Sequence, residues 1–236
     1  MKSTYQSLVK RGYSNTQIEE RCNKLDEASL EKMLGSSTPQ ERTSAARVLG
    51  RRKHTASIQA LSIALENEKS LYSKIAISEA LGSMGIKAVP YLIGMLGKIG
   101  RNQYKQMPNE LFKKTNYPLP RDIAARTIIK IGPPALPALE EILIRGELWQ
   151  IYEAIDSIGY ISFYSHEQRS LKHLFKCLKQ HDDDELLTWK IIRALEAFPL
   201  PKSKKFLQTF LVSSKNKMLT LEAARSLKQI SKNKCD

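Results

Sequence analysis

The sequence predicts an all-α chain built from about six pairs of short amphipathic helices that stack into a solenoid. Three observations carry this prediction. The pattern of one complete helix pair lies between residues 76 and 96. Weaker copies of this pattern recur along most of the chain, and glycine or proline separates the apolar stretches. A helix pair of this size cannot bury its apolar faces alone, so repeated copies must pack against one another.

The complete copy reads AISEALGSMGIKAVPYLIGML over residues 76–96. Its apolar residues recur at spacings of three and four, which gathers them on one face of each helix. Gly82 and Gly85 separate the two helices, and Pro90 falls in the first turn of the second, where a missing N–H costs little. The segment therefore predicts two helices joined by a tight connection.

The weaker copies align on the apolar residue that closes each first helix. Small residues surround these positions, as in SAARVLG, IAARTII and EAARSLK, and small residues let two helices approach closely. The aligned positions are Leu49, Leu81, Ile128, Ile155, Leu195 and Leu227. The second helices are predicted at residues 58–65, 89–96, 136–143, 171–178 and 206–211.

The two ends of the chain are predicted to be caps of a single solenoid over residues 1–236. Residues 1–36 predict helices at 4–10 and 15–34 with weak periodicity, as expected of a terminal unit whose outer face meets water. Residues 202–236 form a basic C-terminal cap. Between the N-terminal cap and the first copy, Thr38 and Glu41 have the spacing of a capping box around Pro39.

The pattern A-x-x-x-A-L-G-x-x-G-x-x-A-x-P-x-L at residues 76–92 resembles a HEAT repeat of the subtype found in phycobilisome lyases. The weaker copies extend this resemblance over residues 39 to about 233. It implies a right-handed α-α superhelix with convex first helices and concave second helices. It implies little about function, because one scaffold serves many unrelated binding roles.

Composition places the chain among ordinary folded proteins, with 42% hydrophobic and 26% charged residues. The N-terminus lacks the apolar segment of a signal peptide and no run is long enough to span a membrane, so we expect a cytoplasmic protein without a membrane partner. Cys22, Cys177 and Cys235 are odd in number and far apart, which favours free thiols over disulfides.

The formal net charge of +14 admits an anionic partner, namely nucleic acid, an acidic protein surface or anionic lipid. Positive charge gathers at residues 101–121 and 202–236, whereas residues 182–201 are acidic. For each charged run taken by itself, a solvated face that aids solubility is the favoured interpretation.

Two gaps between copies are too long for a bare repeat, and both are expected to emerge at an edge of the superhelix. One holds Tyr160, Phe163 and Tyr164 after Gly159. The other is residues 100–120, whose prolines forbid a long helix; long loops in compact domains are often functional. Its aromatic and basic side chains are the predicted partner-binding residues: Arg101, Tyr104, Lys105, Phe112, Lys113, Lys114 and Tyr117.

A row of charged residues stands two positions before the aligned positions. Four of them are arginines, namely Arg47, Arg126, Arg193 and Arg225. Such a row could follow a polyanion along the solenoid. The alternative is that these side chains bridge neighbouring helix pairs.

No set of catalytic residues is visible, since HExxH, GxSxG and phosphate-loop motifs are all missing from the sequence. His173, Cys177 and His181 share a helix face, but three ligands over two turns are too spread for one ion, so no metal and no cofactor are expected. Repeat-built DNA glycosylases use tryptophan and aspartate, for which Trp149, Trp189, Asp122 and Asp156 are candidates by residue type alone. Bilin lyases share the repeat subtype, yet no cluster here identifies a chromophore site.

The sequence therefore predicts a non-catalytic scaffold that binds a protein partner through its concave face and the 100–120 loop. The alternative is a nucleic-acid-binding HEAT-like protein related to DNA-repair glycosylases. Charge and the arginine row motivate that alternative.

Overall fold

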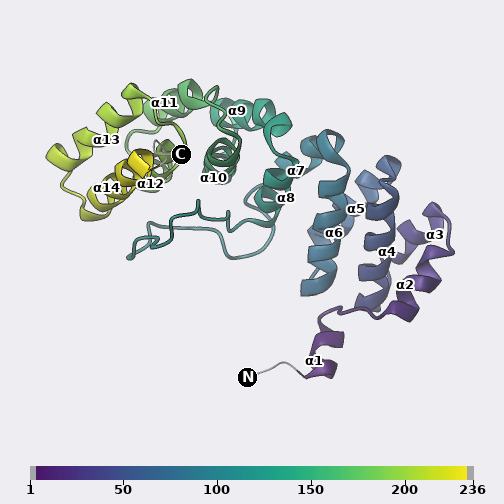
Figure 1. Ribbon diagram of the computed structural model, residues 1–236. Coiled ribbons are helices and arrows are strands. Elements are labelled where there is room, and N and C mark those ends of the chain that lie inside the picture. Colours follow the sequence, from purple (N-terminus) through teal and green to yellow (C-terminus); the bar gives the residue numbers. More distant parts are fainter. Residues whose placement is uncertain (1–3, 233–236) are drawn as a thin grey trace. The chain divides into compact units, whose positions relative to one another are not determined.

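A computed structural model describes residues 4–232 (Figure 1). Over this range the regular structure is entirely helical and no strand is present. The chain divides into two compact units, Met1–Met95 (unit 1) and Leu96–Asp236 (unit 2). Each unit is a stack of antiparallel helix pairs, so the predicted all-α solenoid is confirmed.

Unit 1 holds the N-terminal helices and the first two copies of the repeat. Its helices are α1 (Tyr5–Lys10), α2 (Thr16–Asn23), α3 (Glu27–Met33), α4 (Pro39–Arg52), α5 (Ile58–Asn67), α6 (Leu71–Ser83) and α7 (Val89–Met95). The first helices α4 and α6 pack closely because small residues meet at their contact. A Cβ placed on Gly50 would lie 2.9 Å from the Cα of Ala80.

The N-terminal cap differs from its prediction in one respect. The helix expected over residues 15–34 is broken into α2 and α3, because the Asp26 side chain accepts the Ser29 N–H and starts a new helix. The predicted capping box at the start of α4 is wrong: Thr38 makes no side-chain cap, and Glu41 accepts the Ser36 hydroxyl at 2.6 Å instead.

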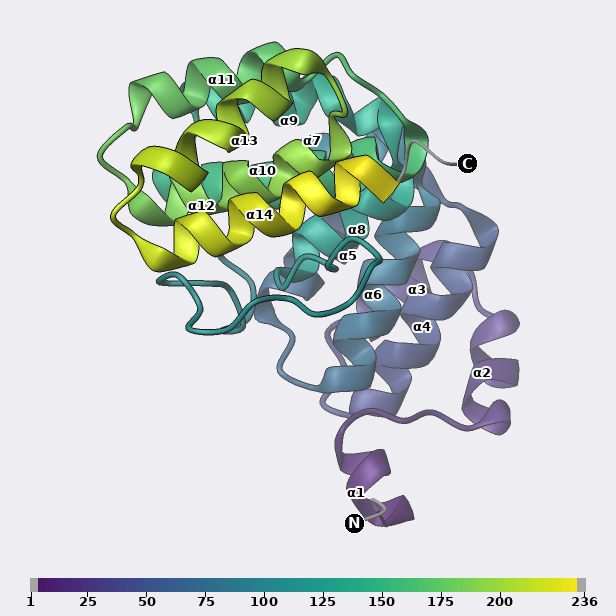
Figure 2. The ribbon, with the colours of Figure 1, turned by 60° about the vertical axis from the view of Figure 1, so that its left-hand side comes forward.

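Unit 2 holds α8 (Ile123–Ile131), α9 (Leu136–Arg145), α10 (Leu148–Ser165), α11 (Leu171–Gln180), α12 (Glu185–Ala194), α13 (Pro201–Ser213) and α14 (Lys217–Lys232). The helices form two layers, with α9, α11 and α13 in one and the first helices in the other (Figure 2). We call the outer side of α8, α10, α12 and α14 the first-helix face.

The aligned positions of the repeats form the core of each unit. Leu49, Leu81, Ile128, Ile155 and Leu195 have no exposed surface. Leu227 is half-buried, because α14 is the last described helix and no further pair covers it. The first five positions are therefore equivalent buried places, and the sixth is partly covered.

The second long gap does not form an insertion at an edge. Tyr160, Phe163 and Tyr164 extend α10, which continues through Gly159 and ends before His166. A mid-helix glycine costs about 1 kcal/mol relative to alanine. The absent side chain makes room for a ring from another segment, as described below.

No helix within residues 4–232 combines the length and the apolar character needed to cross a membrane.

Candidate partner-binding surface

The most unusual feature of unit 2 is residues 97–122, which contain no helix or strand and which we call the strap. Figures 1 and 2 show it on the side of unit 2 away from α11 and α13. The buried carboxylate of Asp122 fixes its two ends. Its Oδ2 accepts the Gly97 N–H at 3.2 Å and the Gln103 amide at 2.8 Å, while Oδ1 accepts the Ala125 N–H at 2.8 Å and caps α8.

Tyr104 is the first of two aromatic side chains that hold the strap on the first-helix face. Its ring meets that of Trp189 edge-on, with ring centroids 5.2 Å apart. The Arg121 guanidinium lies 3.9 Å from the Tyr104 centroid, and the Lys190 ammonium lies 5.5 Å from it. The ring is thus held by an aromatic contact and by two cations, and each kind of contact stabilises by roughly 0.5–1.5 kcal/mol.

Tyr117 is the second anchor and is 1% exposed. Its ring contacts Phe163 and Tyr160, with centroids 5.5 and 6.1 Å away. A Cβ on Gly159 would overlap the Tyr117 hydroxyl, so α10 has a slot at this glycine into which the phenol fits. The hydroxyl has no hydrogen-bond partner among residues 4–232, and burial raises the pKa of Tyr117 well above its usual value.

The predicted edge position of the 100–120 loop is therefore wrong, because the loop lies across first helices and buries Tyr117. Tyr104 and Tyr117 act as internal anchors in this conformation. The other predicted partner-binding residues lie nearer the solvent. Phe112 is half-buried, and the exposed cations are Arg101, Lys105, Lys113 and Lys114.

Beneath the strap lies a buried cluster of charged side chains. The Lys190 ammonium has no exposed surface and lies 2.6 Å from Asp156 Oδ2 and 3.6 Å from Glu153 Oε1. Burial raises the pKa of Glu153 to about 7, Lys190 opposes that shift and Asp156 adds to it. One lysine therefore serves two carboxyl groups.

The cluster continues onto α14. Arg193 Nε lies 3.2 Å from Glu222 Oε1, and the Arg193 guanidinium stacks 3.8 Å from the Trp189 centroid. Arg225 lies 2.6 Å from Glu222 and 2.7 Å from Glu196. Burial raises the pKa of Glu196 to about 7, although Arg225 lowers it. Four carboxyl groups thus share three cations.

This excess of carboxyl groups predicts an unusual dependence of stability on pH. Glu153 and Glu196 titrate near 7 when folded and near 4.5 when unfolded, so the folded chain holds more protons between those values. The stability they contribute is complete below about pH 4.5 and is lost as the pH rises through 7. We expect the free energy of unfolding to fall by about 1–3 kcal/mol per group between pH 5 and pH 8.

Urea unfolding at pH 5, 6.5 and 8 checks this expectation. The variant Glu196→Gln should show a shallower fall, because its amide does not titrate. Glu140 behaves differently, because Arg169 and the hydrogen bond from Ser170 hold its pKa below the usual value. Its contribution to stability is lost only as the pH falls below that value, so it does not affect the comparison between pH 5 and pH 8. Identical slopes for the wild type and the variant would contradict the assignment.

The arginine row consists of bridging residues rather than free cations. Arg47 pairs with Glu19 at 3.3 Å, while Arg193 and Arg225 pair with acids of neighbouring first helices. Arg126 Nε donates to the Pro120 carbonyl at 2.7 Å and so holds the end of the strap. Three of the four arginines therefore make ion pairs of the kind that the bridging interpretation expects.

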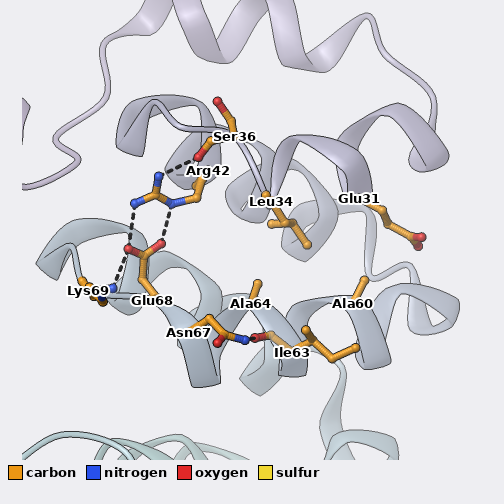
Figure 3. A pocket seen from close by; sticks show the side chains of 11 residues that line it. Glu31, Leu34, Ser36, Arg42, Ala60, Ile63, Ala64, Asn67, Glu68 and Lys69 are labelled. Atoms are coloured by element: carbon orange, nitrogen blue, oxygen red, sulfur yellow. Dashed lines mark hydrogen bonds and ion pairs between the residues drawn. The ribbon is translucent and has the colours of Figure 1, made fainter.

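Unit 1 holds a separate cavity of about 550 Å³ between α3 and α5 (Figure 3). Leu34 and Ile63 line its apolar part, and the Arg42–Glu68 ion pair lies at its end, with Nε and Oε2 2.8 Å apart. Arg42 also donates to the Ser36 carbonyl, and Glu68 accepts the backbone N–H groups of the next two residues. These polar groups already have partners within the fold, so the cavity offers a ligand little beyond apolar contact.

The remaining candidates lie in structural positions. Trp189, Asp122 and Asp156 are buried, and Trp149 packs against Lys98 with the ammonium 5.1 Å from its ring. No exposed pairing of tryptophan with aspartate, as a glycosylase would need, is formed by these four residues.

The predicted thiols and metal candidates also pack into the fold. Cys22 and Cys177 are free and buried, and burial raises the pKa of Cys177 to about 11. His173 Nδ1 lies 3.7 Å from Glu140. Residues 4–232 contain no group of three or more His, Cys, Asp or Glu side chains that could hold a metal ion, and Cys235 lies outside this range.

Comparison with known proteins leaves the chain without a family assignment. No family model matches it, and no curated protein matches it. Among solved structures it is similar to an engineered protein of the Northeast Structural Genomics Consortium, with 18% identity, a TM-score of 0.39 and coverage of 88% of this chain and 99% of that chain.

Two designed armadillo repeat proteins are similar at the same level. One has 16% identity and a TM-score of 0.38, and the aligned region covers 87% of this chain and 100% of that chain. The other, solved in complex with the peptide (KR)4, has 17% identity and a TM-score of 0.34, with coverage of 95% and 90%. The fold assignment rests on the helices described above.

Proposed function

We propose that this protein is a binding scaffold that recognises a segment of a protein partner on the first-helix face of unit 2. The observation that carries the proposal is the strap. It lies on that face without helix or strand, and the aromatic rings of Tyr104 and Tyr117 hold it there. The resemblance of residues 76–92 to a HEAT repeat also supports a binding role, since helical repeats present long side-chain surfaces.

Ion pairing within the arginine row favours a protein partner over nucleic acid. Arg193 is buried and Arg225 is half-buried, both are paired with carboxylates, and Arg47 lies 3.3 Å from Glu19. Neutralised cations release few counterions from a phosphate backbone, and counterion release dominates non-specific nucleic-acid affinity. The ion pairs of this row therefore join neighbouring repeats, and these arginines offer little to a nucleic-acid backbone.

The test is a selection of linear peptides from a displayed random library on the full-length chain, followed by hydrogen–deuterium exchange with an enriched peptide. We expect the peptide to change exchange in residues 97–122 and in α10 and α12, because these segments form the proposed surface. A scrambled peptide of the same composition is the control.

Changes of exchange confined to unit 1, or to α11 and α13, would contradict the proposal. A selection that enriches no sequence over the starting library would also contradict it. Either result would assign the strap a purely structural role.

A further inference from the structure

We infer that the strap is a built-in occupant of the first-helix face, and that the partner is an extended segment carrying tyrosine with lysine or arginine, which displaces the strap. This inference rests on the proposed function and deepens it, because it names the chemistry of the partner. In the free protein the strap occupies this face and therefore competes with the partner for it.

The strap contacts its face as a bound peptide would. Tyr104 lies on Trp189 and Tyr117 fills the slot at Gly159, while most residues between these two rings are exposed. Tyrosine is a frequent anchor at interfaces, since its rigid ring fills a pocket and its loss of conformational entropy is small. The strap therefore has two anchors joined by a solvated stretch.

The slot selects for an aromatic ring. Its floor is the backbone of Gly159, and Ala194 and Phe163 stand beside it. The second anchor site selects for a ring as well, because Trp189 and Lys190 offer an aromatic edge and a cation. A ligand that replaces the strap must bring rings to both sites.

The unpaired acceptors of the face favour a ligand rich in hydrogen-bond donors, as lysine and arginine are. Glu153 Oε2, Asp156 Oδ1 and Glu222 Oε2 are buried and accept no hydrogen bond from residues 4–232. One further carboxylate, Asp184, lies near them, since Tyr152 donates to Asp184 at 2.6 Å and its ring lies 5.9 Å from the Lys190 ammonium. Acceptors without donors favour a segment that brings N–H groups.

The strap itself has the matching composition. Residues 101–121 carry five Lys or Arg and one carboxylate. It belongs to the same chain as the helices it covers and leads directly into α8, so its effective concentration at the face is of the order of millimolar. A ligand in solution therefore binds the free protein with an affinity reduced by the fraction of molecules in which the strap is open.

The experiment uses a labelled synthetic peptide with the sequence of residues 100–120 and the full-length chain. In the variant Tyr104→Ala/Tyr117→Ala the strap has lost its anchors, whereas Trp189 and Gly159 remain. We expect the peptide to bind this variant at least tenfold more tightly than the wild type, measured by fluorescence anisotropy. A peptide with both tyrosines replaced by alanine should bind neither protein.

Loss of a buried ring could unfold the variant, so a second readout is its melting temperature. We expect the tyrosine peptide, but not the alanine peptide, to raise the melting temperature of the variant toward that of the wild type. Adding Gly159→Ala to the variant closes the slot and should abolish that rise.

A second variant loosens the strap without touching the core. Reversal of its four exposed cations to Glu (Arg101, Lys105, Lys113, Lys114) places negative charge on the strap above the buried carboxyl groups, and should raise the affinity for the peptide at least fivefold. The control replaces four exposed lysines on α11 and α13 with Glu (Lys172, Lys176, Lys179, Lys205). It changes the net charge by the same amount and should leave the affinity for the peptide as in the wild type.

Equal affinity of the peptide for wild type and both strap variants, with no rise in melting temperature, would overturn the inference. The proposed function would survive that result if library peptides still protect the first-helix face, so the two failures are distinguishable. A wild-type dimer that forms with concentration and disappears in Tyr104→Ala/Tyr117→Ala would assign the face to the strap of a second copy, and would also overturn the inference.

Discussion

Replacement of Gly159 with alanine is expected to expel Tyr117 from its slot and to lower the free energy of unfolding by about 3 kcal/mol. The added Cβ would overlap the Tyr117 hydroxyl and lie 2.6 Å from its Cζ. Overpacking of a core costs about 1–3 kcal/mol, and loss of a buried aromatic ring costs about 3–5 kcal/mol. Urea unfolding of the full chain measures the difference.

The matched control is Gly94→Ala, which also adds a methyl group inside a helix. No atom lies within 4 Å of the added Cβ at Gly94, so this change should be neutral or stabilise by about 0.5–1 kcal/mol. Combining Gly159→Ala with Tyr117→Phe removes the overlapping hydroxyl and should recover part of the loss. Equal stability of the two alanine variants would show that the slot is not filled.

Replacement of Lys190 with methionine should have a comparable effect, with a dependence on pH. The change leaves Glu153 and Asp156 buried without their shared cation, and removal of one partner of a buried pair costs about 3–5 kcal/mol. The loss should be largest at pH 8. At pH 5, Glu153 binds a proton because its pKa is about 7, so less charge is left unpaired and the loss should be smaller.

Urea unfolding at both pH values measures this effect, and two further variants separate its causes. Lys172→Met removes an exposed lysine of α11 and should change stability by less than about 0.5 kcal/mol. Adding Glu153→Gln and Asp156→Asn to Lys190→Met removes the unpaired charges and should restore most of the stability. A loss that is the same at both pH values would mean that packing of the lysine stem, rather than its charge, is lost.

The repeat architecture could be predicted because its signals are local. Glycine and proline mark the ends of helices within a few residues, and the period of three and four marks the buried side. Leu81 and Leu92 lie in one short stretch and both are fully buried. The break between α2 and α3 was missed because a single cap at Asp26 outweighed a weak apolar period.

The candidate site was predicted only in outline, since its contacts join distant residues. A long, basic, tyrosine-rich loop is visible in the sequence, but nothing near Tyr117 says that it will meet Gly159. The repeat alignment places the residues after Gly159 in a gap between copies, whereas α10 continues through them. A glycine amid a continuing apolar pattern is the signal that could have indicated a close approach.

The charged row illustrates the same limit. The regular spacing of Arg193 and Arg225 was readable, and bridging was one of two interpretations. Their partners Glu222 and Glu196 lie about thirty residues away along the chain, so these ion pairs could not be read from the sequence.

The most direct test of the account is the distance between the strap and its face in the presence of a ligand. Spin labels on cysteines introduced at Lys113 and Lys179, in a chain with Cys235→Ser, report that distance by pulsed electron resonance. Saturating peptide of residues 100–120 should shift the distribution to longer and broader distances as the strap leaves. A distribution that stays unchanged at saturation would show that the strap remains in place, and would contradict the account.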